Sequence, residues 1–331
     1  MIIHHDHFCP QPLCRLLYRK KTLLKKMLDI IVNDDDREFQ CSAVYKPRST
    51  KFSGCPQNYL PPFCASGLVY LPMLKETLIR SVRAGAAEIL RFFNQDFKVS
   101  NKEGVNNLVT EADHASEKAI IDVIRSAFPD HYILSEEAGQ IAQDSPYKWI
   151  IDPIDGTINF AHGIPLNCVS IAIEHKGEIV MAAVYNPHIN ELFFAEKGKG
   201  ATLNDKPIYV SEQTKAIHAC LVTGFPYTYI NATNGPLEIF ERFVRKGVPV
   251  RRLGSAAIDL CWVACGRFDG FYEHKLEAWD SAAGYLIVEE AGGKVTDLAG
   301  NKFSVYQHKV LATNGKIHDE MLEVINNQKE L

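Results

Sequence analysis

A succession of short strand-like segments between residues 132 and 210 is the feature that most restricts the fold of this chain. Apolar runs at 132–134 and 149–151 are followed by five further segments, at 169–173, 179–185, 192–195, 201–203 and 208–210. Lys176-Gly177 separates two of these segments and is typical of a hairpin turn. The five segments from residue 169 onward predict an antiparallel meander, and the mixed order of strands and helices indicates antiparallel-rich sheets rather than the regular strand–helix alternation of a Rossmann fold.

Helical patterns flank the strands on both sides. Apolar residues recur every three or four positions from Leu74 to Phe93, and Thr110-Glu-Ala-Asp113 is typical of a helix start. The apolar stripe expected for that second helix consists of Ala119, Ile120, Val123, Ile124 and Ala127, with Pro129 as the stop. Further helices are expected at 235–245, 255–265 and 280–291, interleaved with strands at 220–223, 268–272 and 294–296. The fold class predicted is α/β (α+β), with helices layered on antiparallel-rich sheets.

The chain divides at Met73 into two unlike parts. Residues 1–72 carry ten Lys and Arg against six Asp and Glu, a net charge of +4, whereas the remaining 259 carry 26 against 34, a net of −8. Residues 1–72 show no sustained hydrophobic period, apart from a basic amphipathic stretch at 16–32. We therefore predict an N-terminal extension at 1–72 and a catalytic domain at 73–331, with halves at 73–212 and 213–331.

The extension leaves several interpretations open. The stretch at 16–32 could lie on a membrane surface, the segment His4-His5-Asp6-His7 could bind a metal, and the whole segment could bind a partner. The interpretation we favour is a disordered extension, or translated sequence upstream of a start at Met73, because no packed core is visible to order it.

Composition excludes several classes of function. A net charge of −4 gives no broad basic surface, so nucleic acid is not expected as the main partner. No apolar run reaches 18 residues and the N-terminus lacks a signal-peptide pattern, so neither membrane insertion nor secretion is expected. Nine cysteines without a paired CxxC pattern suit a reducing compartment, and the cytoplasm is the predicted location.

Three clusters of carboxylates are the candidates for a metal site. Glu136-Glu137 follows one predicted strand, Asp152-Pro-Ile-Asp155 follows another, and Asp280 opens a predicted helix. A chain reversal at Pro153 is expected to aim Asp152 and Asp155 to one side. Many oxygen ligands without nearby His or Cys favour Mg²⁺ over zinc. Each cluster alone could be a cap or a turn, but the three together predict a metal site.

The segment Asp155-Gly156-Thr157 could also bind a phosphate group. Gly156 permits close backbone approach, and a helix that starts there would present free N–H groups to a phosphate. A metal beside such a helix start would let an otherwise acidic domain bind an anionic substrate.

Several long motifs of this chain resemble those of the inositol monophosphatase family of Mg²⁺-dependent, Li⁺-sensitive phosphatases. Two of them match the family signatures, and three shorter ones occur in the expected order. They are Trp149-Ile-Ile-Asp-Pro-Ile-Asp-Gly-Thr-Ile-Asn-Phe160, Trp279-Asp-Ser-Ala-Ala-Gly284 continuing to Glu290-Ala-Gly-Gly293, Leu108-Val-Thr-Glu-Ala-Asp113, Ser135-Glu-Glu137 and Arg252-Leu-Gly-Ser-Ala-Ala257. The resemblance covers about residues 73–325 and implies a layered α-β-α-β-α sandwich.

The resemblance also implies a set of site residues. Glu136, Asp152 and the Ile154 carbonyl would bind a first Mg²⁺. Asp152, Asp155 and Asp280 would bind a second, and Glu136 would help to hold a weaker third. The resemblance further implies that Thr157, paired with Asp113, orients the attacking water, so that Glu136, Thr157 and Asp113 are the catalytic residues. Substrate contacts would come from Asp155, Asp280, the Gly156 and Thr157 amides, Lys102 in the 98–105 loop, and Glu273 and Ala256 in a polyol pocket.

The function implied is hydrolysis of a small phosphate monoester, with myo-inositol 1-phosphate as the expected substrate and a metal-activated water as nucleophile. Sister groups that act on 3'-phosphoadenosine 5'-phosphate, fructose 1,6-bisphosphate or histidinol phosphate supply the alternative substrates. A non-catalytic binding or regulatory protein on the same scaffold is the alternative of another class. Family relatives are commonly dimers, so a homodimer is also expected.

Overall fold

The structure is a computed structural model that describes residues 67–101, 108–226 and 235–326. Contacts divide the chain into two units, Met1–Pro62 and Phe63–Leu331, and only the second contains described residues. The predicted extension, with its amphipathic stretch and its His cluster, therefore lies almost entirely outside the described residues. None of the helices in the described ranges combines the length and apolar character needed to cross a bilayer.

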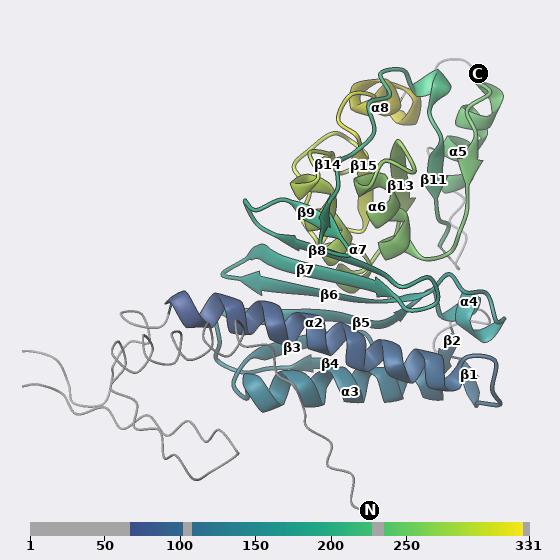
Figure 1. Ribbon diagram of the computed structural model, residues 1–331. Coiled ribbons are helices and arrows are strands. Elements are labelled where there is room, and N and C mark those ends of the chain that lie inside the picture. The colour runs from purple at the N-terminus through teal and green to yellow at the C-terminus, as the bar shows by residue number, and fades with distance from the viewer. Residues whose placement is uncertain (1–66, 102–107, 227–234, 327–331) are drawn as a thin grey trace, which may run out of the picture. The chain divides into compact units, whose positions relative to one another are not determined.

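The larger sheet has eight strands in the order β10-β9-β8-β7-β6-β5-β3-β4 (Figure 1). Neighbouring strands are antiparallel, except for the parallel pair β3 and β5. The strands are β3 (Tyr132–Ser135), β4 (Gly139–Ile141), β5 (Tyr147–Asp155), β6 (Cys168–His175), β7 (Glu178–Asn186), β8 (Glu191–Glu196), β9 (Ala201–Leu203) and β10 (Lys206–Pro207). The predicted antiparallel meander is thus confirmed.

The hairpin between β6 and β7 turns at Lys176 and Gly177, as predicted. Both residues have positive φ, 53° and 85°, which is the conformation of a type I′ turn. The expected strand at 208–210 is wrong: the edge strand is β10, two residues earlier, and residues 208–210 have no strand assignment.

A second sheet of five strands has the order β12-β11-β13-β15-β14. β11 pairs in parallel with β12 and β13, whereas β15 is antiparallel to β13 and β14. These strands are β11 (Leu221–Thr223), β12 (Val250–Arg251), β13 (Gly270–His274), β14 (Lys294–Thr296) and β15 (Lys309–Thr313). A separate hairpin joins β1 (Val99–Asn101) to β2 (Leu108–Thr110).

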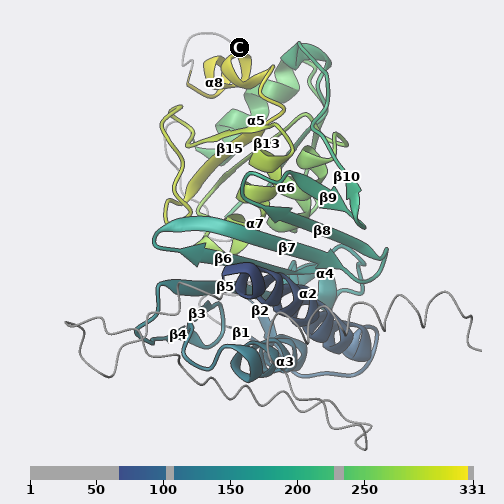
Figure 2. The ribbon, with the colours of Figure 1, turned by 60° about the vertical axis from the view of Figure 1, so that its left-hand side comes forward.

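Helices cover the sheets in layers, as Figures 1 and 2 show. One pair covers the outer face of the eight-stranded sheet, a second pair lies between the two sheets, and a third pair covers the far face of the five-stranded sheet. In that order the pairs are α2 (Gly67–Phe92) with α3 (Glu111–Ala127), α6 (Ala256–Ala264) with α7 (Ala278–Glu290), and α5 (Pro236–Arg245) with α8 (His318–Asn326). The short helices are α4 (Thr157–Ala161) and the 3₁₀ turn η1 (Ala216–His218). The expected α-β-α-β-α sandwich is confirmed.

Successive residues of a strand pack into different hydrophobic cores. Trp149 and Ile151 of β5 point to the core beneath α2 and α3, while Ile150 between them joins the central core around α6 and α7. In β13, Phe271 likewise joins the central core and Tyr272 the outer one. This alternation explains why the buried strands read as continuous apolar runs: both faces of each sheet are covered.

Helix α2 begins at Gly67, six residues before the boundary expected at Met73. Its stripe of Leu74, Leu78, Val82, Ala86 and Ile89 is fully buried, as the periodicity predicts.

Candidate metal centre

A bulge in β5 turns Asp152 and Asp155 to the same side of the sheet. In a regular strand, residues three apart face opposite sides. Asp152 pairs with Ser170 of β6, whereas Asp155 pairs with Cys168, so that three steps along β5 match two along β6. The expected chain reversal at Pro153 is therefore wrong: the strand continues through Asp155, and the extra residue of the bulge reorients the second carboxylate.

Asp280 comes from the start of α7, on the opposite side of the site. Its Oδ2 accepts a hydrogen bond of 2.7 Å from the backbone N–H of Glu277, the N-cap residue of the helix. Asp280 is therefore the third residue of the helix and part of a capping box, which fixes its direction.

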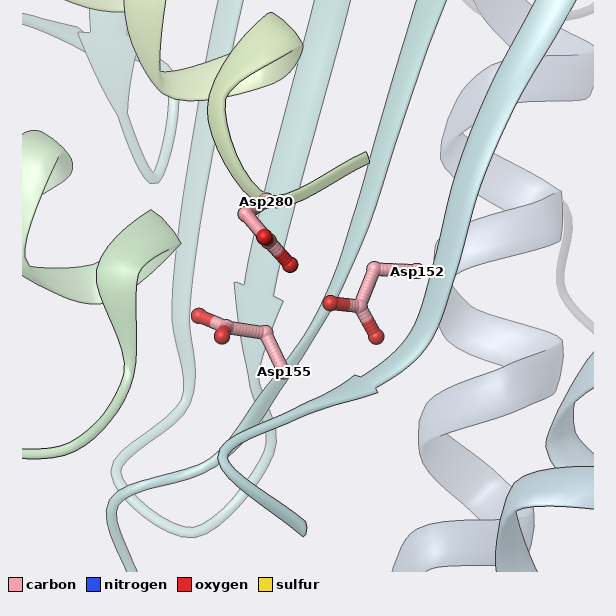
Figure 3. A group of neighbouring side chains, drawn as sticks. All are labelled: Asp152, Asp155 and Asp280. Atoms are coloured by element: carbon pink, nitrogen blue, oxygen red, sulfur yellow. The ribbon is translucent and has the colours of Figure 1, made fainter. Parts of the chain in front are cut away.

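The three aspartates converge, as Figure 3 shows. Asp152, Asp155 and Asp280 each offer an oxygen within 4.8 Å of the others. Burial, followed by repulsion from neighbouring carboxylates, raises the pKa of all three; that of Asp155 rises to about 6. A cation would remove this repulsion, and carboxylate oxygens without nitrogen or sulfur ligands fit Mg²⁺. The residues present thus fit the cofactor that the sequence predicts.

Helix α6 holds the Asp155 carboxylate in place. Oδ2 of Asp155 accepts hydrogen bonds from Ser255 Oγ at 2.5 Å and from the Ala257 N–H at 2.7 Å. These bonds oppose the effect of burial on the Asp155 pKa. They engage one carboxylate oxygen from the α6 side and leave Oδ1 for the centre of the site.

Glu136 lies beside this group without being one of the three converging residues. It follows β3, and its N–H donates to the Ile151 carbonyl of β5 over 3.2 Å. Its negative charge contributes to the raised pKa values of Asp152, Asp155 and Asp280. The parallel pairing of β3 with β5 therefore brings the first predicted carboxylate cluster to the second.

Thr157 and Asp113 meet at the start of α4. Thr157 Oγ1 lies 3.4 Å from Asp113 Oδ1 and 3.1 Å from the Ile154 carbonyl oxygen. The other Asp113 oxygen accepts from the N–H and the hydroxyl of Thr110, at 2.7 and 2.6 Å. Burial raises the pKa of Asp113 to about 7, even though the Thr110 bonds lower it.

Gly156 is required by the close packing of the backbone here. Its φ is +93°, and a Cβ at this position would lie 2.9 Å from the carbonyl oxygen of Leu166. Gly156 is the N-cap residue of α4, so the predicted helix start after Asp155 is present.

The predicted polyol-pocket residues come from the second sheet and the central helices. Glu273 on β13 is buried, and burial raises its pKa to about 8, opposed by the Arg252 charge and reinforced by Asp155. Gly224 leaves room for it, since a Cβ there would lie 2.2 Å from the Glu273 carboxylate. Ala256 is the first residue of α6, next to the groups that bind Asp155. Lys102 lies outside the described residues.

Three polar residues behind the site were missed by the sequence analysis: Ser116, Glu117 and Ser255. Ser116 and Glu117 are buried on α3, and Ser255 is the N-cap of α6. The first two extend the apolar stripe of α3 by one turn toward its start. Polar residues at helix-face positions close to Asp113 were the signal that could have revealed them.

Comparisons with known proteins agree with this geometry. The model of the inositol monophosphatase family matches residues 73–330. The chain is 43% identical over 251 residues to an inositol-1-monophosphatase of Synechocystis sp., an alignment that covers 76% of this chain and 88% of that protein. It is 40% identical to a protein of Neisseria meningitidis serogroup B named putative Nus factor SuhB, covering 77% of this chain and 98% of the relative.

A solved structure has the same fold. The extragenic suppressor protein suhB of Bartonella henselae superposes with a TM-score of 0.73 at 35% identity, and the match covers 77% of this chain and 99% of that one.

Proposed function

Because the chain belongs to the inositol monophosphatase family, whose members are phosphoric monoester hydrolases, we propose that it is a Mg²⁺-dependent phosphatase with myo-inositol 1-phosphate as its preferred substrate. The observation that carries the proposal is the convergence of the buried Asp152 and Asp155 with the partly buried Asp280, which comes from a distant segment. Without a bound cation, these mutually repelling carboxylates would destabilise the fold.

The carboxylates of the site and one backbone carbonyl would share two to three Mg²⁺ ions. Glu136, Asp152 and the Ile154 carbonyl would hold one ion, Asp152, Asp155 and Asp280 a second, and Glu136 would help with a weaker third. When bound, Mg²⁺ supplies Lewis acidity that neutralises charge on the phosphate oxygens and activates water. The hydrogen bonds from Ser255 and Ala257 keep Asp155 turned toward the other two aspartates.

The chain's own groups orient the reactants. Thr157 has one hydroxyl hydrogen and two acceptors, Asp113 Oδ1 and the Ile154 carbonyl. With that hydrogen engaged, its oxygen can accept a hydrogen bond from the attacking water and aim a lone pair of this water at phosphorus. The amides of Gly156 and Thr157 would bind the phosphate, and Lys102 would approach it from the loop before β2.

Substrate choice would depend on the residues around Glu273. A buried carboxyl group there can accept hydrogen bonds from polyol hydroxyls, which favours inositol 1-phosphate. The motif Thr157-Ile-Asn-Phe-Ala-His162 also resembles the inositol group more than the nucleotide-phosphatase group, where Lys-Glu-Phe usually follows. The other substrates named above remain the alternative. A homodimer, lithium inhibition and a cytoplasmic location belong to the same proposal.

A second candidate is a binding or regulatory role on the same scaffold. It is favoured by the name Nus factor SuhB that relatives from Neisseria and Haemophilus carry. A phosphate-release assay distinguishes the two candidates, because only an enzyme would turn over a substrate.

The test is a phosphate-release assay on the full chain with Mg²⁺, with and without Li⁺. The substrates are inositol 1-phosphate, fructose 1,6-bisphosphate, histidinol phosphate and 3'-phosphoadenosine 5'-phosphate. We expect inositol 1-phosphate to react fastest and Asp152→Asn to abolish release. Faster turnover of the nucleotide would overturn the substrate assignment, and no release from any substrate would favour the second candidate.

A further inference from the structure

We propose that Glu117 is a positioning residue, which sets the direction of Glu136 and thereby the affinity of the metal centre. The inference rests on the proposed function, because it assumes that Glu136 is a metal ligand. Glu117 belongs to none of the sequence motifs discussed above, and it is only 7% exposed on the inner face of α3.

One oxygen of Glu117 receives hydrogen bonds from both sides of Glu136. Its Oε1 accepts from Ser135 Oγ at 2.5 Å, from the Glu137 N–H at 3.2 Å and from the Ala138 N–H at 2.9 Å. Ser135 precedes Glu136, and the other two donors follow it. The turn after β3 therefore wraps around the Glu117 carboxylate, and Glu136 sits at the middle of the wrapped segment.

The charge of Glu117 strengthens this arrangement. Hydrogen bonds to an ionised acceptor are roughly twice as strong as those between neutral groups. A carboxylate shielded from water with three donors is well satisfied, so it holds the turn firmly rather than adding an unpaired charge. Together with the bond from the Glu136 N–H to Ile151, these contacts fix the backbone of Glu136 relative to β5.

Ser116, the residue before Glu117 in α3, binds the segment that carries Asp152 and Asp155. Ser116 Oγ donates to the Pro153 carbonyl at 2.8 Å, inside the bulge that separates Asp152 from Asp155. Consecutive residues of α3 thus anchor the two segments that must meet at one cation. This placement explains why buried polar groups continue the apolar stripe of α3.

The test measures Mg²⁺ binding directly, by isothermal titration calorimetry and by the increase in melting temperature that Mg²⁺ produces, alongside phosphate release. Loss of a partner behind a metal ligand typically weakens metal affinity 10- to 100-fold. We expect Glu117→Ala to raise the Mg²⁺ dissociation constant about tenfold and the Mg²⁺ concentration for half-maximal activity by a similar factor. Glu117→Gln keeps an acceptor oxygen and should restore most of the affinity.

Two further variants separate positioning from general stability. Ile124→Ala removes buried apolar volume from the same helix and should lower the melting temperature without changing Mg²⁺ affinity. Ser135→Ala removes one of the three bonds and should shift the affinity in the same direction as Glu117→Ala but less, so the proposal stays testable if Glu117→Ala does not fold.

The outcomes are distinct. Wild-type affinity in Glu117→Ala and Ser135→Ala, or an equal shift in Ile124→Ala, overturns the positioning role and leaves the proposed function intact. If the wild-type chain itself does not bind Mg²⁺, the proposed function is wrong, and the positioning role is wrong with it.

Discussion

The Tyr70 hydroxyl lies 2.8 Å from Nε2 of His131, and this contact ties the first turn of α2 to the segment before β3. The Tyr70 ring also contacts Phe128 edge-on and lies 5.2 Å from the Tyr147 ring, centroid to centroid. Tyr70 precedes Met73, so residues upstream of the predicted boundary pack into the same unit as the three converging aspartates.

Removal of residues 1–72 should therefore cost more stability than removal of residues 1–66. A hydrogen bond contributes about 1 kcal/mol and an aromatic pair about 0.5–1.5 kcal/mol. We expect the fragment 73–331 to lose about 2 kcal/mol of unfolding free energy relative to 67–331, measured by urea denaturation. Tyr70→Phe in the longer fragment should lose only the hydrogen-bond part, and equal stability of both fragments would contradict the role given to Tyr70.

The contribution of His131 to stability should fall in mild acid, because this residue must stay neutral in the folded protein. Trp149 Nε1 is a donor only, and it binds His131 Nδ1 at 2.9 Å, so that this nitrogen has to be unprotonated. Burial lowers the pKa of His131 to about 4, whereas the unfolded chain has the ordinary value of 6.5. Between these values His131 binds more protons in the unfolded state, so its contribution to the unfolding free energy decreases as the pH falls from about 6.5 toward 4. The buried carboxyl groups with raised pKa values, among them Asp113 and Asp155, act in the opposite direction, so the effect of His131 is measured as a difference between the wild type and a variant without it.

Denaturation curves at several pH values test this prediction. His131→Asn keeps an acceptor for Trp149 and has no titrating group, so its unfolding free energy relative to the wild type should increase as the pH falls from about 6.5 toward 4. The other titrating groups are common to both proteins and cancel in this difference, including His318, whose pKa burial lowers to about 4. A difference that stays constant with pH, or that decreases in acid, would contradict the prediction.

Gly85→Ala should destabilise the protein although alanine is the better helix former. A Cβ at Gly85 would lie 2.7 Å from Ile120 Cδ1 and 2.7 Å from Ser116 Oγ, where α2 crosses α3. The propensity gain is about 1 kcal/mol, and overpacking typically costs 1–3 kcal/mol. We expect a net loss of roughly 1 kcal/mol and weaker Mg²⁺ binding, because Ser116 must turn away from Pro153. Ala84→Gly, on a less buried position of α2, is the matched control, which should lose stability without affecting Mg²⁺.

Local patterns were sufficient to predict the meander, the hairpin at Lys176-Gly177 and the segments that carry Asp152, Asp155 and Asp280. These features depend on residues close in sequence: short apolar runs, turn residues, and carboxylates at strand ends or at a helix start. The start of α2 was not predicted, because Pro72 inside the helix suggests a boundary and the contacts of Tyr70 are with residues more than 50 positions away.

The supporting residues of the site were missed for a similar reason. Glu117 and Ser116 bind segments 18 to 37 residues away in sequence, and such partners leave no periodic signal. The bulge in β5 is also tertiary, since it is defined by the register with β6. The carboxylates that meet at the candidate site were therefore recognisable from sequence, whereas the contacts that position them required the structure.

Asp152→Asn should stabilise the metal-free protein while it abolishes the effect of Mg²⁺. Burial and the neighbouring carboxylates hold the pKa of Asp152 well above its usual range, so a charge at this position destabilises the fold when no cation is bound. The amide keeps an oxygen that can accept the Ile154 N–H bond, 3.0 Å long in the wild type. We expect the melting temperature in EDTA to rise by about 2–4 °C, as 1 kcal/mol would produce in a domain of this size. Added Mg²⁺ should then raise the melting temperature less than in the wild type, and phosphate release should be lost.

Asp122→Asn, at an exposed position paired with Lys118, is the charge-matched control and should change neither the melting temperature nor phosphate release. A lower melting temperature for Asp152→Asn in EDTA would mean that the carboxylate stabilises the fold by itself, so that repulsion among the aspartates would no longer indicate a cation site.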